Sequence, residues 1–138
     1  AEIIPFTPPE APLEGMSTQL NYDMKRDLPG YLGSQIRDTI AVTVRSVADV
    51  VAFNREDPEL RAPYGQARLE GIVSDNTSEE QYDQVRKALK DAGRKFLGTP
   101  WEEHGLDAIL SVDITHGRYA AVARYPALSI PMGYRESG

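Results

Sequence analysis

The central part of the chain carries hydrophobic residues at the spacing of an α-helix. From residue 35 onward, apolar side chains recur every three or four positions and so share one helical face; they are Ile36, Ile40, Val44, Val47, Ala48 and Val51. A loop rich in Asp, Pro and Arg follows over residues 54–63. A second, short helical pattern covers residues 66–72.

A longer amphipathic helix is predicted further along the chain. Ser78 and Gln81 have the spacing of a capping box, in which each side chain satisfies a backbone N–H of the first turn. The following apolar stripe has helical spacing and consists of Tyr82, Val85, Leu89, Ala92 and Phe96. The next short helix is predicted to begin at Thr99-Pro100 and to end at Gly105. We therefore predict that residues 35–104 are helical.

Both ends of the chain have a different pattern. Residues 1–34 are predicted to form a brief strand at 2–4 and a connector that begins with Pro5, Pro8, Pro9 and Pro12 and turns between Gly30 and Gly33. Residues 107–112 and 127–130 are short apolar runs typical of buried strands. The alanine-rich segment 117–124 between them suits a helix. Residues 105–138 are thus predicted to form a strand-helix-strand unit, and the fold class is α/β.

Length and charge exclude several classes of protein. The 138 residues suit one domain, and the net charge of −6 disfavours nucleic acid and anionic membranes as partners. The chain has no cysteine and no apolar run near the roughly 18 residues that a membrane helix needs. No signal peptide is visible, so we expect a cytoplasmic protein. Because the sequence does not begin with Met, we also expect a cut or processed chain.

Two histidines are the candidates for chemistry near neutral pH. His104 precedes Gly105 in the last turn of a predicted helix, where an imidazolium can complement the helix dipole. His116 lies after a predicted strand, where open α/β sheets place their ligands. Asp113 and Ser111 are near it in the sequence, but no serine lies in the strained turn that a nucleophile needs. The spacing of the residues also predicts no metal site, phosphate loop or cofactor.

Several segments together resemble enzymes of the amidase signature family. The resemblance is carried by residues 27–32, 47–54 and 64–66 and, further along the chain, by residues 104–110 and 120–134. The last of these segments ends in Tyr125-Pro126-Ala127-Leu128-Ser129-Ile130-Pro131-Met132-Gly133-Tyr134. They follow the family's order over nearly the whole chain and match its C-terminal region. The resemblance implies a mixed β-sheet flanked by helices. It also implies that the loop at Ile114, Thr115 and His116 shapes a substrate pocket.

The same resemblance implies hydrolysis of carboxamide C–N bonds by a serine nucleophile, a second serine in a cis peptide and a lysine. In the family these three residues lie in the N-terminal half, and no Gly/Ser-rich segment here can supply them. We therefore expect a C-terminal fragment that provides scaffold and pocket wall, with no catalytic residue of its own. Its expected partners are the missing N-terminal part and a small amide substrate, and an unpaired sheet edge predicts homodimers or aggregation.

Two alternatives remain open at this point. The first is a non-catalytic domain that shares the fold and binds a small ligand or a partner at the His116 loop. The second is a complete hydrolase that uses His116. The upstream coding sequence and the activity of a His116→Ala variant separate the three interpretations.

Overall fold

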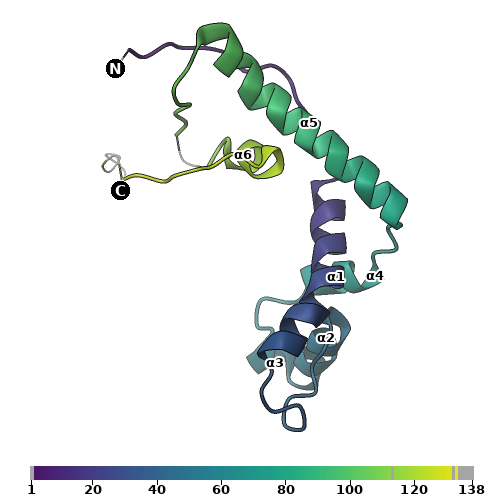
Figure 1. Cartoon of the computed structure of the whole chain (residues 1–138). Coiled ribbons are helices and arrows are strands. Elements are labelled where there is room, and N and C mark those ends of the chain that lie inside the picture. The colour runs from purple at the N-terminus through teal and green to yellow at the C-terminus, as the bar shows by residue number, and fades with distance from the viewer. Residues whose placement is uncertain (1, 113, 132, 134–138) are drawn as a thin grey trace. The chain divides into compact units, whose positions relative to one another are not determined.

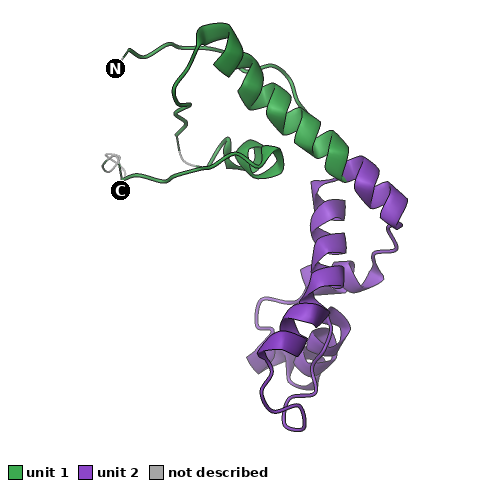
Figure 2. Ribbon diagram, viewed as in Figure 1, with its two compact units in different colours: residues 1–14, 86–138 green, residues 15–85 purple. Residues whose placement is uncertain are grey.

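The structure, a computed structural model, describes residues 2–112, 114–131 and 133. The helices in this part of the chain are α1 (Met16–Gln35), α2 (Val47–Glu56), α3 (Pro58–Arg61), α4 (Ala67–Ser74), α5 (Glu79–His104) and α6 (Gly117–Ala123) (Figure 1). The chain divides into two compact units, one of residues 15–85 and one of residues 1–14 with 86–138, and the boundary falls within α5 (Figure 2).

The unit of residues 15–85 is a set of packed helices. Helix α2 packs against α3 and α4, and α1 packs against α2 and α4. The buried side chains of this unit are Val47, Val51, Ile72 and Tyr82. Ser46 is the N-cap of α2, because its hydroxyl accepts a hydrogen bond from the backbone N–H of Asp49. The helix therefore begins at Val47, within the segment whose apolar spacing predicted a helix.

The predicted helix over residues 35–51 is wrong between residues 36 and 46, which form an ordered loop. The Asp38 carboxylate accepts the backbone N–H groups of Ile40 and Ala41 and so replaces helical hydrogen bonds. The Arg45 guanidinium donates to the carbonyls of Thr39, Val42 and Val44, which holds the loop from the other side. As a result Ile40, predicted to face the core, is 91% exposed.

Helix α1 replaces the predicted connector, although Pro29 lies inside it. Contacts with distant residues hold it in place. The Asn21 side chain donates to the Asp75 carboxylate at 2.9 Å, and the Lys25 ammonium donates to the Asp75 carbonyl at 2.7 Å. The Tyr82 hydroxyl, at the start of α5, donates to the Asp23 carboxylate at 2.7 Å.

The unit of residues 1–14 and 86–138 is built on α5 and α6. Its hydrophobic core contains Ala11, Phe96, Leu97 and Ala123, with Ala92, Ile109, Tyr119 and Ala120 packed against it. The predicted capping box at the start of α5 is confirmed by hydrogen bonds in both directions between Ser78 and Gln81. The helix then runs through Thr99-Pro100 without the predicted new start. Helix α6 occupies the predicted helical segment.

The predicted α/β fold with a mixed sheet is wrong for the part of the chain that the structure describes, because none of those residues belongs to a strand. The segments 107–112 and 127–130 are irregular, as is the predicted strand at 2–4. A strand requires backbone hydrogen bonds to a neighbouring strand, and an apolar composition does not supply that neighbour. Most apolar side chains of these segments are exposed instead, as Leu128 illustrates at 87%, whereas Ile109 is partly buried against the core.

A pH dependence of stability follows from Asp75. Hydrogen bonds from Thr77 and Asn21 lower its pKa from the ordinary value of 3.8, despite some desolvation. A lowered pKa stabilises the folded state fully above 3.8, and this contribution is lost as the pH falls through the folded pKa. We expect Asp75→Asn to be less stable than the native chain at pH 7. Its midpoint of thermal unfolding should then fall less steeply between about pH 4.5 and pH 2.5.

Circular dichroism melts across this pH range measure the effect. Asp107→Asn, which removes an exposed carboxylate, is the control and should retain the native profile. Identical pH profiles for Asp75→Asn and the native chain would show that the Asp75 hydrogen bonds do not stabilise the fold.

Candidate functional site

The loop predicted to line a pocket forms a turn that leads into α6. The Thr115 hydroxyl donates to the Val112 carbonyl at 2.9 Å, and the Gly117 backbone N–H donates to the Ile114 carbonyl at 3.0 Å. The Ile114 side chain is 87% exposed. The structure therefore places Ile114, Thr115 and His116 together in one turn, with an apolar side chain directed to solvent.

His116 occupies the N-cap position of α6. Its backbone carbonyl accepts the N–H groups of Tyr119 and Ala120, so its main chain starts the helix. Its imidazole is half-buried. The ring lies 5.1 Å from the Phe96 ring at an interplanar angle of 60°, and 6.4 Å from the Tyr119 ring in an edge arrangement. These contacts fix the imidazole against aromatic carbon.

The rings of Phe96 and Tyr119 stack on each other and contact the His116 ring. Their ring centroids are 3.6 Å apart and the planes are nearly parallel, at 7°. Phe96 comes from α5 and is buried, while Tyr119 comes from the first turn of α6. The packing of the two helices thus creates an aromatic cluster of Phe96, His116 and Tyr119. Sequence reasoning assigned Phe96 to the core and did not link it to His116.

The surroundings of His116 suit binding better than proton transfer. An imidazole that acts as a base is usually oriented by a carboxylate, whereas the ring contacts of His116 are aromatic. Asp113, which a triad would require, lies outside the described residues. Within the described part of the chain, no group of three His, Asp or Glu side chains could hold a metal ion. An aromatic cluster with one imidazole can stack on a ligand and exchange one hydrogen bond with it.

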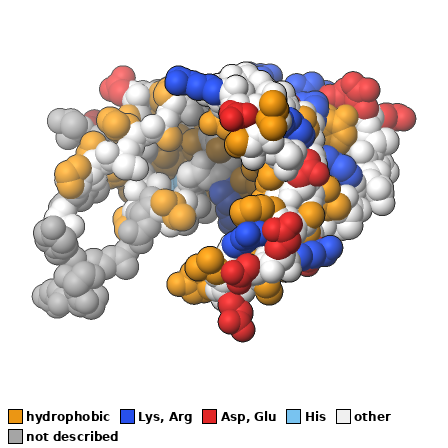
Figure 3. Space-filling model, turned by 90° about the horizontal axis from the view of Figure 1, so that it is seen from below, with side chains coloured by type: hydrophobic (Ala, Val, Ile, Leu, Met, Phe, Trp, Pro, Cys, Tyr) orange, Lys and Arg blue, Asp and Glu red, His pale blue; other side chains and the backbone are white. Residues whose placement is uncertain are grey.

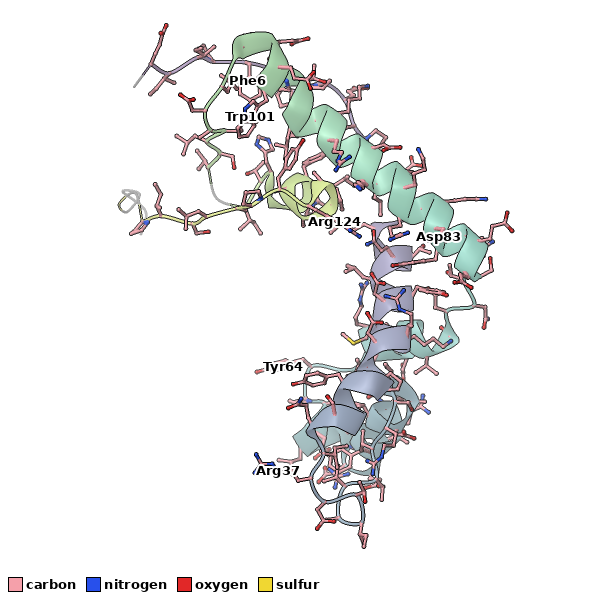
Figure 4. The ribbon with its side chains drawn as sticks, viewed as in Figure 1. Phe6, Arg37, Tyr64, Asp83, Trp101 and Arg124 are labelled. Carbon is pink, nitrogen blue, oxygen red and sulfur yellow. The ribbon has the colours of Figure 1, made fainter. Side chains whose placement is uncertain are left out.

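His104 lies in the last turn of α5, as predicted, and Gly105 follows with a positive φ of 58°. Its imidazole centroid is 6.1 Å from the Phe6 ring. Figure 4 marks Phe6 and Trp101 at this end of α5. His104 therefore joins the N-terminal segment to the helix, which is a structural role.

Two of the three upstream segments that carry the resemblance, residues 47–54 and 64–66, meet in the structure. The Asn54 amide donates to the Gln66 side-chain oxygen at 3.1 Å, and the Gln66 amide donates to the Val51 carbonyl at 3.4 Å. Gly65, with φ of 79°, makes the turn that brings Gln66 to this position. These residues tie the end of α2 to the start of α4 and stabilise the fold.

A second aromatic cluster was missed by sequence reasoning. Tyr22 and Tyr82 stack with centroids 4.2 Å apart, and the Arg26 guanidinium lies over both rings. Burial, together with the hydrogen bond to Asp23, raises the pKa of the Tyr82 hydroxyl. The cluster connects α1 to the first turn of α5, and the only signal in the sequence was the place of Tyr82 in the apolar stripe.

Apolar side chains are also exposed elsewhere. They lie among charged groups on the face drawn in Figure 3. In the segments on either side of α6, the exposed large hydrophobic residues include Leu110, Val112, Ile114, Leu128 and Ile130. Among the described residues, no helix combines the length and apolar composition needed to cross a bilayer.

Comparison with known proteins gives one relationship. The chain is 28% identical over 110 residues to a probable amidase of Arabidopsis thaliana, and the match covers 78% of this chain. It covers 21% of the plant protein, so the chain spans about a fifth of the length of this relative. No family model and no solved structure matches the sequence. The chain is therefore distantly similar to part of an amidase.

Proposed function

We propose that the chain is a segment of an amidase-like hydrolase that provides scaffold and one wall of the substrate site. The observation that carries this proposal is the similarity to a probable amidase over 78% of the chain. Among the segments that carry the sequence resemblance, residues 47–54 and 64–66 hold the Asn54–Gln66 contact, and residues 104–110 and 120–134 flank the His116 turn. A carboxamide is the substrate class that this relationship supports.

In this proposal the reacting groups lie on another part of the protein. Amide hydrolysis requires an activated nucleophile next to donors that stabilise the oxyanion. Four serines have local structural roles: Ser46 and Ser78 cap helices, and the hydroxyls of Ser34 and Ser74 donate to carbonyls three residues earlier. The described histidines contact aromatic rings. The chain alone should therefore not turn over an amide.

The His116 turn is the proposed contribution to the pocket. The exposed Ile114 side chain supplies apolar surface, and the imidazole at the rim of the aromatic cluster can hydrogen-bond the substrate. Contacts with the rings of Phe96 and Tyr119 hold that imidazole in place. This arrangement binds substrate and transition state equally, so it affects KM more than kcat.

The experiment uses the protein encoded by the whole reading frame and compares two histidine variants. His116→Ala is expected to raise KM for a simple carboxamide by roughly threefold to tenfold, with kcat changed by less than about twofold. His104→Ala is the matched control, because it lies in the same unit away from the turn, and it should leave both constants unchanged. Ammonia release measures the rates.

Other results contradict the proposal in different ways. A loss of kcat by about a hundredfold in His116→Ala would make His116 a catalytic base. An unchanged KM would remove the turn from the pocket. A reading frame without a lysine and a serine pair upstream would favour the non-catalytic binding domain, as would ligand binding by a chain that never hydrolyses carboxamides.

A further inference from the structure

One face of α5 gathers positive charge in a chain that is otherwise acidic. Within residues 86–95 lie five of the chain's 15 basic residues and a single carboxylate, whereas the whole chain carries a net charge of −6. We call the basic residues of this segment the α5 basic stripe; they are Arg86, Lys87, Lys90, Arg94 and Lys95. Four of them are exposed and Lys90 is half-buried.

The stripe is held in a fixed direction by the packing of its helix. Arg86, Lys90 and Arg94 follow one another at intervals of four residues, so they share one side of α5. Leu89 and Phe96 are buried in the interior of the protein. Because the apolar face is covered, the basic face is directed to solvent and cannot rotate inward.

The lowered pKa of Asp91 is consistent with a positive potential at this surface. Its carboxylate accepts a hydrogen bond from the Lys87 ammonium at 2.6 Å. That bond, and then the charges of Lys87, Arg94 and Lys90, lower the pKa of Asp91. Residues 86–95 carry five cationic side chains and one carboxylate, a formal net charge of +4.

The length of the stripe selects the kind of anion that fits. At 1.5 Å per residue, residues 86–95 span about 14 Å, which four or five residues of an extended peptide would cover. Glu102 follows Lys95 two helical turns later and brings negative charge back to the same side. A duplex or a bilayer would extend over Glu102 and Glu103 and meet repulsion there, whereas a short segment would not.

We propose that the α5 basic stripe is a docking surface for a short acidic segment of a partner protein. This interaction is independent of the amidase-like function, since α5 presents the stripe through residues that do not belong to the aromatic cluster. The recognition is electrostatic and reversible, because exposed ion pairs are individually weak and are screened by salt.

The test measures binding of a fluorescein-labelled hexaglutamate peptide to the full chain by fluorescence anisotropy at low salt. The double variant Lys90→Glu/Arg94→Glu is expected to weaken binding by roughly tenfold. Asp91→Asn should strengthen it by about twofold, because it removes the carboxylate that is paired with Lys87. Raising the salt concentration should weaken binding to the native chain.

The matched control is Arg37→Glu/Arg68→Glu, which changes the net charge equally at two exposed positions outside the stripe (Figure 4 labels Arg37). It should keep the native affinity within about twofold. Lys90→Gln/Arg94→Gln, with an intermediate loss expected, keeps the test valid if the charge reversal disturbs folding. Equal losses in the two Glu double variants would overturn the proposal, as would no binding or equally tight binding of duplex DNA or phosphatidylserine vesicles.

Discussion

Phe96→Ala is expected to lower the free energy of unfolding by about 3–5 kcal/mol, the range observed for aromatic side chains removed from protein cores. Phe96 is 9% exposed and belongs to the core with Ala11, Leu97 and Ala123. Its removal leaves a cavity and also ends the stacking on Tyr119 at 3.6 Å. Both effects act on the contact between α5 and α6.

Urea unfolding followed by circular dichroism measures the loss. Phe53→Ala is the control for the loss of a phenyl ring, since Phe53 is 47% exposed and lies under the Arg61 guanidinium. We expect it to cost about 1 kcal/mol or less. Equal costs for the two variants would mean that the aromatic cluster is not part of a cooperative core.

The Phe96 variant also has a consequence for the site. The imidazole of His116 rests against Phe96, so the cavity would free the ring to adopt other rotamers. Under the proposed function, Phe96→Leu in the whole enzyme should retain most of the stability and still raise KM. A raised KM in this stable variant would show that the loss of substrate binding does not result from unfolding.

The sequence predicts helices well where the signal is local. The capping box of Ser78 and Gln81 and the apolar stripe after it define α5, because both act within a few residues of the backbone they order. The stop at Gly105 is equally local, since its positive φ favours glycine. These signals required no knowledge of the rest of the chain.

The predictions from sequence were wrong where long-range contacts or polar side chains determine the backbone conformation. Helix α1 contains Pro29 and two glycines, yet it persists because Asn21, Lys25 and Asp23 bond to residues about fifty positions away. Conversely, the helical spacing of apolar residues over 36–46 is overridden by hydrogen bonds of Asp38 and Arg45. The spacing of apolar residues contains no information about long-range hydrogen bonds or about side chains that bond to the local backbone.

The candidate site could be predicted only in part for the same reason. Ile114, Thr115 and His116 were predicted to line a pocket because they follow a predicted strand; the described residues before them form no strand, and their place in a pocket stays a prediction. The contact of His116 with Phe96 depends on how α5 packs against α6, which local patterns do not specify. The apolar runs at 107–112 and 127–130 predicted strands because composition alone cannot tell an exposed segment from a paired one.

Helices α5 and α6 approach each other closely at Gly93, where a side chain would meet atoms of α6. A Cβ atom at this position would lie 2.7 Å from a Val122 methyl group, 2.8 Å from the Tyr119 carbonyl oxygen and 2.9 Å from the Ala123 backbone nitrogen. Two of these atoms belong to the backbone of α6 and cannot move aside unless the helix shifts. Glycine is therefore required here by space, although it is a poor helix former.

Gly93→Ala is expected to lower the free energy of unfolding by about 2 kcal/mol, because overpacking outweighs the roughly 1 kcal/mol gained from helix propensity. Gly98→Ala in the same helix is the matched control, since its Cβ would meet only the Tyr125 hydroxyl, at 3.8 Å. It should raise stability by about 0.5–1 kcal/mol. Urea unfolding measures both changes. Stabilisation by both substitutions would show that α6 does not pack on α5 as closely as the structure indicates.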